Sequence, residues 1–184
     1  MDAAPSHPPI VMWGVVRAGA ADLLPATVPA GLAGLLVVAD HAVEPRTHGG
    51  PVTVVRVQAP ATAAGAFAAA IRAAPAAADA VAWFDGALPT SRVIERLAAG
   101  LGTRDAVVVA SPISDAVKQV RGGLVVGGVR RDGLCRPTVP VLVRASVARE
   151  RLLPALAAAH DVFDALAVAG CAVTVVVPGT PAST

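Results

Sequence analysis

The sequence is poor in lysine and in charge, and each shortage excludes a class of protein. The 15 basic residues include a single lysine, Lys118, so the others are arginines. These bases form no run, and a net charge of +2 gives no case for nucleic-acid binding. Charged residues make up 15% of the chain and hydrophobic residues 55%, which excludes an intrinsically disordered protein.

The sequence also lacks metal-binding cysteine motifs and long apolar runs. Cys135 and Cys171 are far apart and show neither CxxC nor CxxH spacing, so we expect two reduced thiols, at least one of them buried. The longest apolar run, residues 165–177, is shorter than the about 18 residues that span a bilayer. Residues 1–9 have no charged start and no apolar segment typical of a signal peptide, and they are predicted to form a flexible tail. These features predict a cytoplasmic protein with no membrane contact.

Short runs of Val, Leu and Ile recur between Ala-rich segments. Most runs are continuously apolar, which is typical of strands covered on both faces. The predicted strands are 10–16, 35–39, 52–57, 80–84, 106–110, 139–143 and 172–177. Strands that alternate with helices predict a mostly parallel α/β sheet, and 184 residues suit one domain, assigned to 10–184.

Polar residues before the Ala-rich segments predict where the helices begin. Thr62 is expected to cap a helix over 63–74, and Thr90 or Ser91 a helix over 92–99 that ends at Gly100. Ser146 is expected to cap a helix that continues to 159 and bends at Pro154.

One segment breaks the alternation of strands and helices. Two short β-like runs flank Arg121-Gly122-Gly123, which predicts a β-hairpin. The edges of such a hairpin are exposed, and proteins usually cover exposed strand edges. A partner subunit is one element that could cover them. We place this arm at about residues 115–138.

Four stretches between residues 83 and 168 carry motifs that occur together in one family. They are 83–89 (WFDGALP), 112–120 (PISDAVKQV), 131–140 (RDGLCRPTVP) and 162–168 (VFDALAV), the last followed by an apolar strand up to Gly179. They resemble the motifs VHDAARP, PVTDTIKRV, RxxLxRxxTP and TDDASLV of the methylerythritol-phosphate cytidylyltransferase family. The resemblance implies a three-layer α/β fold of the nucleotide-diphospho-sugar transferase type with an inserted β-hairpin arm. It also implies a homodimer through that arm.

The family joins CTP to a sugar-alcohol phosphate in isoprenoid precursor synthesis, but its nucleotide motifs are degraded here. The glycine-rich loop keeps Gly19, while its other glycines, its arginine and its lysine are replaced. The replacing residues are Ala21, Leu23, Pro25 and Ala30. Such a loop binds triphosphate through bare backbone N–H groups, and the two bases neutralise charge during transfer. Ala63 and Ala66 replace an arginine and a serine of the next nucleotide element. With Lys118 as the only lysine, neither active-site lysine of the family is present.

Asp85, directly after a predicted strand, is the candidate metal ligand. Its carboxylate suits Mg²⁺, although the residues alone favour a turn residue before the helix at Thr90. Because Mg²⁺ is held jointly by protein and triphosphate, we interpret Asp85 as structural or vestigial. No cofactor is expected unless the protein is active, in which case Mg²⁺ is required.

Four residues are the candidates for binding the acceptor substrate. The resemblance implies that Arg136 reaches the acceptor phosphate, that Asp115 and Lys118 approach the same pocket, and that Asp164 approaches the acceptor hydroxyls. The alternative is that Lys118 and Arg136 are solvated charges on the arm or at a dimer edge. For Asp164 a structural role is favoured, because Phe163 replaces its acidic neighbour.

Three functional hypotheses remain open. The first is a non-catalytic protein that acts as a binding, regulatory or assembly partner, with a sugar phosphate as a candidate ligand and a protein partner that the sequence does not name. The second is an active cytidylyltransferase in which another arginine, such as Arg17, replaces the missing lysines. The third is a scaffold subunit whose pocket has no ligand.

Overall fold

The computed structural model describes residues 10–18, 27–39, 50–58, 62–84, 88–114, 117–130 and 134–177. The strands are β1 (Met12–Ala18), β2 (Gly34–Ala39), β3 (Val52–Arg56), β4 (Ala80–Phe84), β5 (Ala106–Pro112), β6 (Val117–Arg121), β7 (Leu124–Val129), β8 (Cys135–Arg144) and β9 (Val173–Val176). The helices are α1 (Ala63–Ala73), α2 (Ser91–Leu101), α3 (Ala145–Val147), a π-helical turn η1 (Ala148–Leu152), α4 (Leu153–Leu156) and α5 (Val162–Val168).

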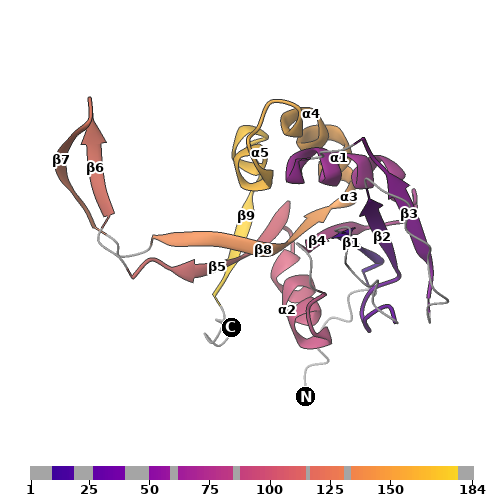
Figure 1. Cartoon of the computed structure of the whole chain (residues 1–184). Helices are drawn as coiled ribbons and strands as arrows, with labels where there is room; N and C mark the ends of the chain where they lie inside the picture. Colours follow the sequence, from indigo (N-terminus) through magenta and orange to yellow (C-terminus); the bar gives the residue numbers. More distant parts are fainter. Residues whose placement is uncertain are drawn as a thin grey trace, which may run out of the picture.

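A seven-stranded sheet forms the centre of the body, in the order β3-β2-β1-β4-β8-β5-β9. Its neighbouring strands run parallel except at β8, which is antiparallel to both β4 and β5. This arrangement confirms the predicted mostly parallel α/β sheet. It also explains the continuously apolar strands, because helices lie against both faces (Figure 1).

Two hydrophobic clusters, one on each face of the sheet, make the three layers. On one face, α1, α4 and α5 pack over the strands, and the Phe67 ring lies 5.3 Å from that of Trp83. On the other face α2 buries Ile94, Leu97 and Leu101. The amphipathic pattern of residues 91–101 therefore places one stripe of the helix on the sheet.

The first two predicted helices are present, with one difference in where they end. Thr62 caps α1 as expected, and its Oγ1 accepts a hydrogen bond from the Gly65 N–H at 3.0 Å. Gly100, expected to end α2, lies inside it, and the helix ends at Gly102 with φ +40°. A Cβ on Gly100 would lie 3.3 Å from Val107 and 3.4 Å from Val176, so glycine lets α2 approach the sheet closely.

The third helical segment is shorter and less regular than predicted. It begins at Ala145, so Ser146 lies within its first turn and is not the cap. The Leu153 N–H donates to the Ala148 carbonyl five residues earlier, which is the hydrogen bond of a π-helical turn. This turn directly precedes Pro154, whose missing N–H cannot continue the regular ladder, and the segment ends at Leu156 and not at 159.

β8 is longer than the predicted strand 139–143 because β5 pairs with it beyond the body. Val141 to Val143 pair with both β4 and β5, whereas Cys135 to Thr138 pair with β5 alone. The two parts are separated by a break in register that leaves Val139 and Pro140 without a β5 partner. The part paired only with β5 forms a neck that leads out of the body (Figure 1).

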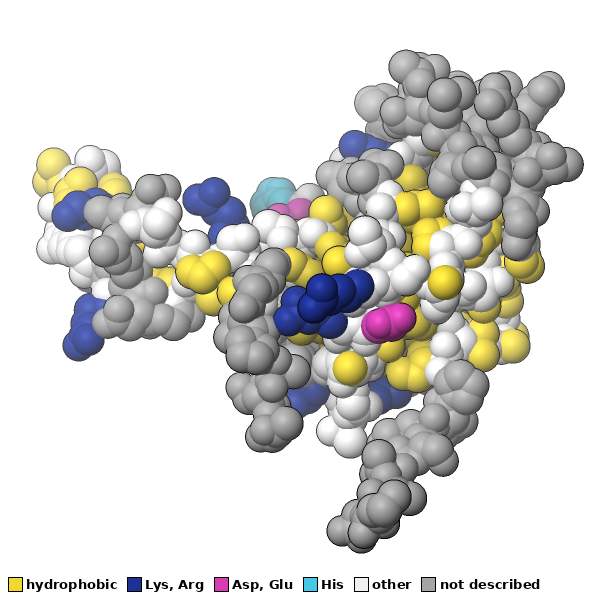
Figure 2. All heavy atoms as spheres, turned by 90° about the horizontal axis from the view of Figure 1, so that it is seen from below, with side chains coloured by type: hydrophobic (Ala, Val, Ile, Leu, Met, Phe, Trp, Pro, Cys, Tyr) yellow, Lys and Arg dark blue, Asp and Glu magenta, His cyan; other side chains and the backbone are white. Residues whose placement is uncertain are grey.

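The predicted hairpin is confirmed as a separate two-stranded sheet of β6 and β7. Gly122 and Gly123 form its turn with φ of +55° and +79°, values that favour glycine. Figure 1 shows this hairpin projecting from the end of the body opposite β3. Its apolar side chains are exposed: Val120 by 57%, Leu124 by 71%, Val125 by 65% and Val126 by 54%. They gather at the far end of the arm in Figure 2.

Candidate functional site

The carboxyl ends of β1 and β4 mark the place where an open α/β sheet usually binds its ligand. From β1 the sheet extends through β2 to β3 on one side and through β4 on the other. The order in which strands are added therefore reverses between β1 and β4, although the two strands are parallel. Both strands end on buried residues, Ala18 and Phe84. Gly19 and Asp85 follow directly but lie outside the described residues, so their proposed vestigial and metal-binding roles stay predictions.

Three alanines stand where the resemblance expects nucleotide-binding side chains. Ala30 is exposed in a turn in which the Leu32 N–H donates to the Pro29 carbonyl at 3.2 Å. Ala63 begins α1, and Ala66 is 0% exposed, packed in the cluster beneath that helix. A methyl group at each position provides no charge and no hydrogen-bond donor. Ala66 contributes to the core of the fold.

A small hollow lies at the outer ends of β5 and β8, where the neck begins. We call it the Arg136 hollow; its volume is about 60 Å³ and its lining residues are Ser111, Pro112, Ile113, Ser114 and Arg136. Ser111 and Arg136 are directly paired across the two strands, and the Ile113 N–H donates to the Leu134 carbonyl at 3.2 Å. Two serines and one arginine therefore line the hollow, and strand pairing fixes the positions of Ser111 and Arg136.

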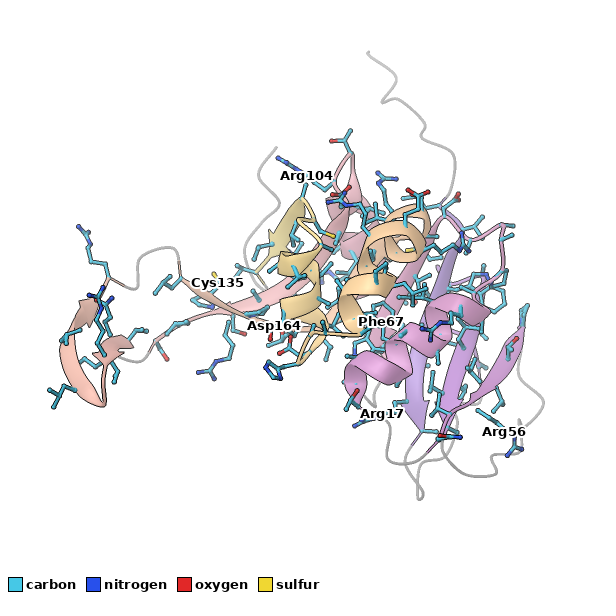
Figure 3. The ribbon with its side chains drawn as sticks, turned by 90° about the horizontal axis from the view of Figure 1, so that it is seen from above. Arg17, Arg56, Phe67, Arg104, Cys135 and Asp164 are labelled. Atoms are coloured by element: carbon cyan, nitrogen blue, oxygen red, sulfur yellow. The ribbon has the colours of Figure 1, made fainter. Side chains whose placement is uncertain are left out.

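The other acceptor-side candidates do not line this hollow. Lys118 is exposed on β6 of the arm. Asp164 is exposed in the first turn of α5, at the end of the body nearest the neck (Figure 3). Asp115 lies outside the described residues. The sequence singled out Arg136 but not Ser111, whose position across from Arg136 depends on strand pairing and has no local signal.

A set of charged residues at the opposite end of the sheet was not predicted. The Asp79 carboxylate accepts a hydrogen bond from the Val11 N–H at 2.9 Å. Asp105 Oδ2 accepts one from the Ala172 N–H at 2.9 Å and one from Arg151 Nη1 at 3.0 Å. Each aspartate directly precedes a predicted strand, a local signal for a residue that anchors the amino end of that strand.

Arginines complete this network by binding backbone carbonyls. Arg151 also donates to the carbonyls of Ala169 and Gly170, which fixes the turn after α5. Arg144 binds the carbonyls of Arg104 and Gly102 beyond α2. Arg149 Nη2 lies 2.7 Å from the Pro75 carbonyl after α1. These contacts tie helix ends to strand starts, so the charges at this end of the sheet have a structural role.

Two groups in this region have shifted pKa values. The hydrogen bond from the Ala172 N–H, assisted by Arg151, holds the pKa of Asp105 below its usual value against the opposing effect of burial. Burial raises the pKa of the Cys171 thiol, which keeps it protonated and unreactive at neutral pH. Both Cys171 and Cys135 are free, as predicted, but each is only half-buried, so the expectation that at least one is buried is wrong.

Neither a metal cluster nor a membrane helix is found within the described ranges. No group of three or more His, Cys, Asp or Glu side chains in these ranges is arranged to hold a metal ion. No helix in them is long and apolar enough to cross a membrane.

The order of the sheet, the helices on both faces and the arm inserted between β5 and β8 define an α/β fold of the nucleotidyltransferase type. Solved structures of methylerythritol-phosphate cytidylyltransferases have this same fold. No protein-family model matches the sequence, and no curated protein matches it significantly. The likeness to these enzymes is therefore one of structure.

Three of these structures give the extent of the likeness. The 4-diphosphocytidyl-2C-methyl-D-erythritol synthase of Anaerococcus prevotii superimposes with a TM-score of 0.71 at 13% identity, over 92% of this chain and 90% of its own. The cytidylyltransferase of Francisella tularensis gives 0.62 at 16%, over 91% and 90%. That of Thermus thermophilus gives 0.60 at 20%, over 81% and 74%. The resemblance seen in the sequence is confirmed at the level of the fold.

Proposed function

We propose that this chain is a cytidylyltransferase-like protein that has lost nucleotidyl transfer and keeps an anion-binding hollow on the acceptor side. In this role it acts as a binding, regulatory or assembly partner. The observation that carries the proposal is a contrast: Ala30, Ala63 and Ala66 stand at nucleotide-side positions, while Arg136 and two serines line a hollow at the neck.

The chemistry of the Arg136 hollow suits a phosphate group. A guanidinium group offers several N–H donors in a planar fork that matches phosphate oxygens, and serine hydroxyls add neutral donors. The hollow is small, about 60 Å³, so we propose that it receives only one end of a ligand. The ligand we propose is accordingly a sugar phosphate whose phosphate group enters the hollow.

We also propose a homodimer formed through the arm. A two-stranded hairpin is marginally stable by itself in water, and this one exposes Val120, Leu124, Val125 and Val126. Burying these side chains against a second copy removes apolar surface from water and supports the hairpin at the same time.

The alternative function is transfer of CMP from CTP to a sugar-alcohol phosphate. Arg17 favours it, since its side chain is exposed at the carboxyl end of β1 (Figure 3), directly before the loop that holds triphosphate in the family. Asp85 would then hold Mg²⁺ after β4. This alternative requires Arg17 to supply the charge that two lysines and an arginine supply in the family pattern.

Thermal unfolding in the presence of ligands separates the two functions. A ligand at about 100 times its Kd stabilises the protein by about 2.7 kcal/mol, which raises Tm by about 5–11 °C for a chain of this size. We expect methylerythritol phosphate to raise Tm and CTP with Mg²⁺ to leave it unchanged. The Arg136→Ala variant should lose the shift, while Arg72→Ala, an exposed arginine on α1, should keep it.

An assay of nucleotidyl transfer tests whether the protein is non-catalytic. Pyrophosphate release from CTP, Mg²⁺ and methylerythritol phosphate, abolished in Asp85→Ala, would establish the active enzyme and overturn the non-catalytic function. A Tm that responds to neither ligand would leave only the scaffold hypothesis.

A further inference from the structure

The strand β9 forms one edge of the central sheet and pairs with β5 alone. The Ala106 N–H donates to the Ala172 carbonyl at 3.2 Å, so Ala172 directs its carbonyl towards β5. Backbone groups alternate in direction along a strand, and Val173, Val175 and Val177 therefore direct theirs to the open side. In the described part of the chain no other segment pairs with that side. β9 thus presents a row of N–H and carbonyl groups to a further strand.

β9 lacks the features that usually prevent an edge strand from pairing, which are a charged side chain, a proline or a bulge. The opposite edge strand, β3, follows Pro51 and ends at the exposed Arg56. β9 has the sequence VTVV and an unbroken register with β5, and its Val175 is 50% exposed. Val175 shares a face of the sheet with Val173, which packs against the core. An added strand would therefore find an apolar contact at Val175.

The amino end of β9 is positively charged. Three arginines, Arg104, Arg144 and Arg151, lie near it with one acid, Asp105. Arg151 pairs with Asp105, and Arg144 binds backbone carbonyls. Arg104 is exposed, directly precedes the residue whose N–H donates to the Ala172 carbonyl, and points away from the body (Figure 3). Among the described side chains no acid pairs with it, so its charge is available to a partner.

This charge favours a different protein over a second copy of the chain. In an antiparallel pair of two β9 strands, the strand residues beside Arg104 would be the valines at the far end of the other β9, which carry no acid. In a parallel pair the two Arg104 side chains would lie at the same end, where like charges repel. A segment that carries its own acid matches the charge.

We infer that the outer edge of β9 binds an extended segment of a different protein as an additional strand, with an acidic residue of that segment beside Arg104. Val173, Val175 and Val177 supply the backbone pairing. Antiparallel pairs are slightly more stable than parallel ones, so the acid is placed at the carboxyl end of the segment. None of the residues that line the Arg136 hollow belongs to β9, so the inference is independent of the function proposed for that hollow.

A synthetic peptide tests the inference on the full-length protein. The probe is a fluorescein-labelled peptide of sequence Ser-Asn-Val-Thr-Val-Thr-Asp-Glu, and fluorescence anisotropy gives its dissociation constant. Val175→Pro removes an outward N–H and no bond to β5, and it should raise the dissociation constant by about tenfold or more. Val175→Thr keeps the N–H and a strand-forming side chain, and it should leave the constant within about threefold. Tryptophan fluorescence confirms that both variants are folded.

Exchanging the charge provides a second test that leaves β9 unchanged. Arg104→Glu should weaken binding of the probe by about three- to tenfold, and more at low salt than at high salt. A probe that ends in Lys-Lys should bind Arg104→Glu better than it binds the wild type. Arg72→Glu, the same change on the exposed side of α1, is the matched control and should leave both affinities unchanged.

Hydrogen exchange followed by NMR locates the contact. In the free protein the outward Val175 N–H should exchange faster than the Thr174 N–H, which is directed to β5, and the probe should slow the exchange of Val175. No saturable binding of the probe, or binding that Val175→Pro leaves unaltered, would overturn the inference. Self-association without the probe that is lost in Val175→Pro would identify a second copy as the occupant and overturn the choice of partner.

Discussion

Valine serves opposite purposes in the body and in the arm. In β2, Val37 and Val38 are 0% exposed beneath helices and neighbouring strands, whereas in β7 Val125 is 65% exposed and Val126 54%. The body encloses its apolar side chains within one chain, and the arm presents the same residue type to solvent. Apolar residues of the body stabilise the fold, whereas the exposed ones of the arm support the dimer proposed above.

The largest effect should come from breaking the core of the body. Phe67→Ala removes a ring that is fully buried and packed against Trp83, and it should lower the free energy of unfolding by about 3–5 kcal/mol. Denaturant unfolding followed by tryptophan fluorescence measures the loss. Val125→Ala in the arm is the control and should change the stability of the monomer by less than about 0.5 kcal/mol. Equal losses in both variants would contradict the contrast.

The next largest effect should appear in the arm, as lost association. The double variant Val120→Ser/Val125→Ser removes apolar area from one face of the hairpin. The expected loss is about 2 kcal/mol of association energy, or roughly a 30-fold weaker dimer. Monomer stability should be unchanged. Sedimentation analysis measures the affinity, and an unaltered dimer would show that this face is not in the contact.

Within the body, the polar network at the amino end of the sheet should contribute less than the core. Asp105→Asn removes the charge next to Arg151 while keeping an acceptor for the Ala172 N–H, and it should cost about 1–2 kcal/mol at pH 7. Because the folded pKa of Asp105 is lowered, its stabilisation is present above about pH 4, where the unfolded carboxyl group is ionised. It is lost as the pH falls through the folded pKa.

The difference in unfolding free energy between wild type and Asp105→Asn should therefore shrink when both are measured at pH 3. The same substitution at Asp164, exposed on α5, is the control. If the difference in unfolding free energy between wild type and Asp105→Asn is the same at pH 7 and pH 3, the Asp105 charge does not stabilise the fold.

Much of the fold could be predicted because the body follows local rules. Residues 80–84 form a strand with the predicted bounds, since an apolar run between polar residues is covered on both faces. The first part of β8 could not be predicted, because Cys135-Arg136-Pro137-Thr138 has no strand pattern and becomes a strand only by pairing with β5. The π-helical turn before Pro154 likewise depends on how the preceding residues pack.

The candidate site was less predictable than the fold. Arg136 was found by resemblance, and the serines beside it depend on how two strands far apart in sequence meet. Asp105 carried a signal in its position before a strand, but its partner Arg151 lies 46 residues away and carried none. A sequence motif records residues that are close along the chain. The Asp105–Arg151 network instead depends on which helix and strand ends the fold brings together.

The antiparallel direction of β8 has a consequence for how this protein can change over generations. β5 leads outward and β8 returns beside it, so the arm is an enlarged loop of one long hairpin. Insertions or deletions between residues 114 and 134 leave the strand order of the body untouched. The arm, and with it the proposed association surface, can thus be lengthened, exchanged or lost independently of the domain that carries it.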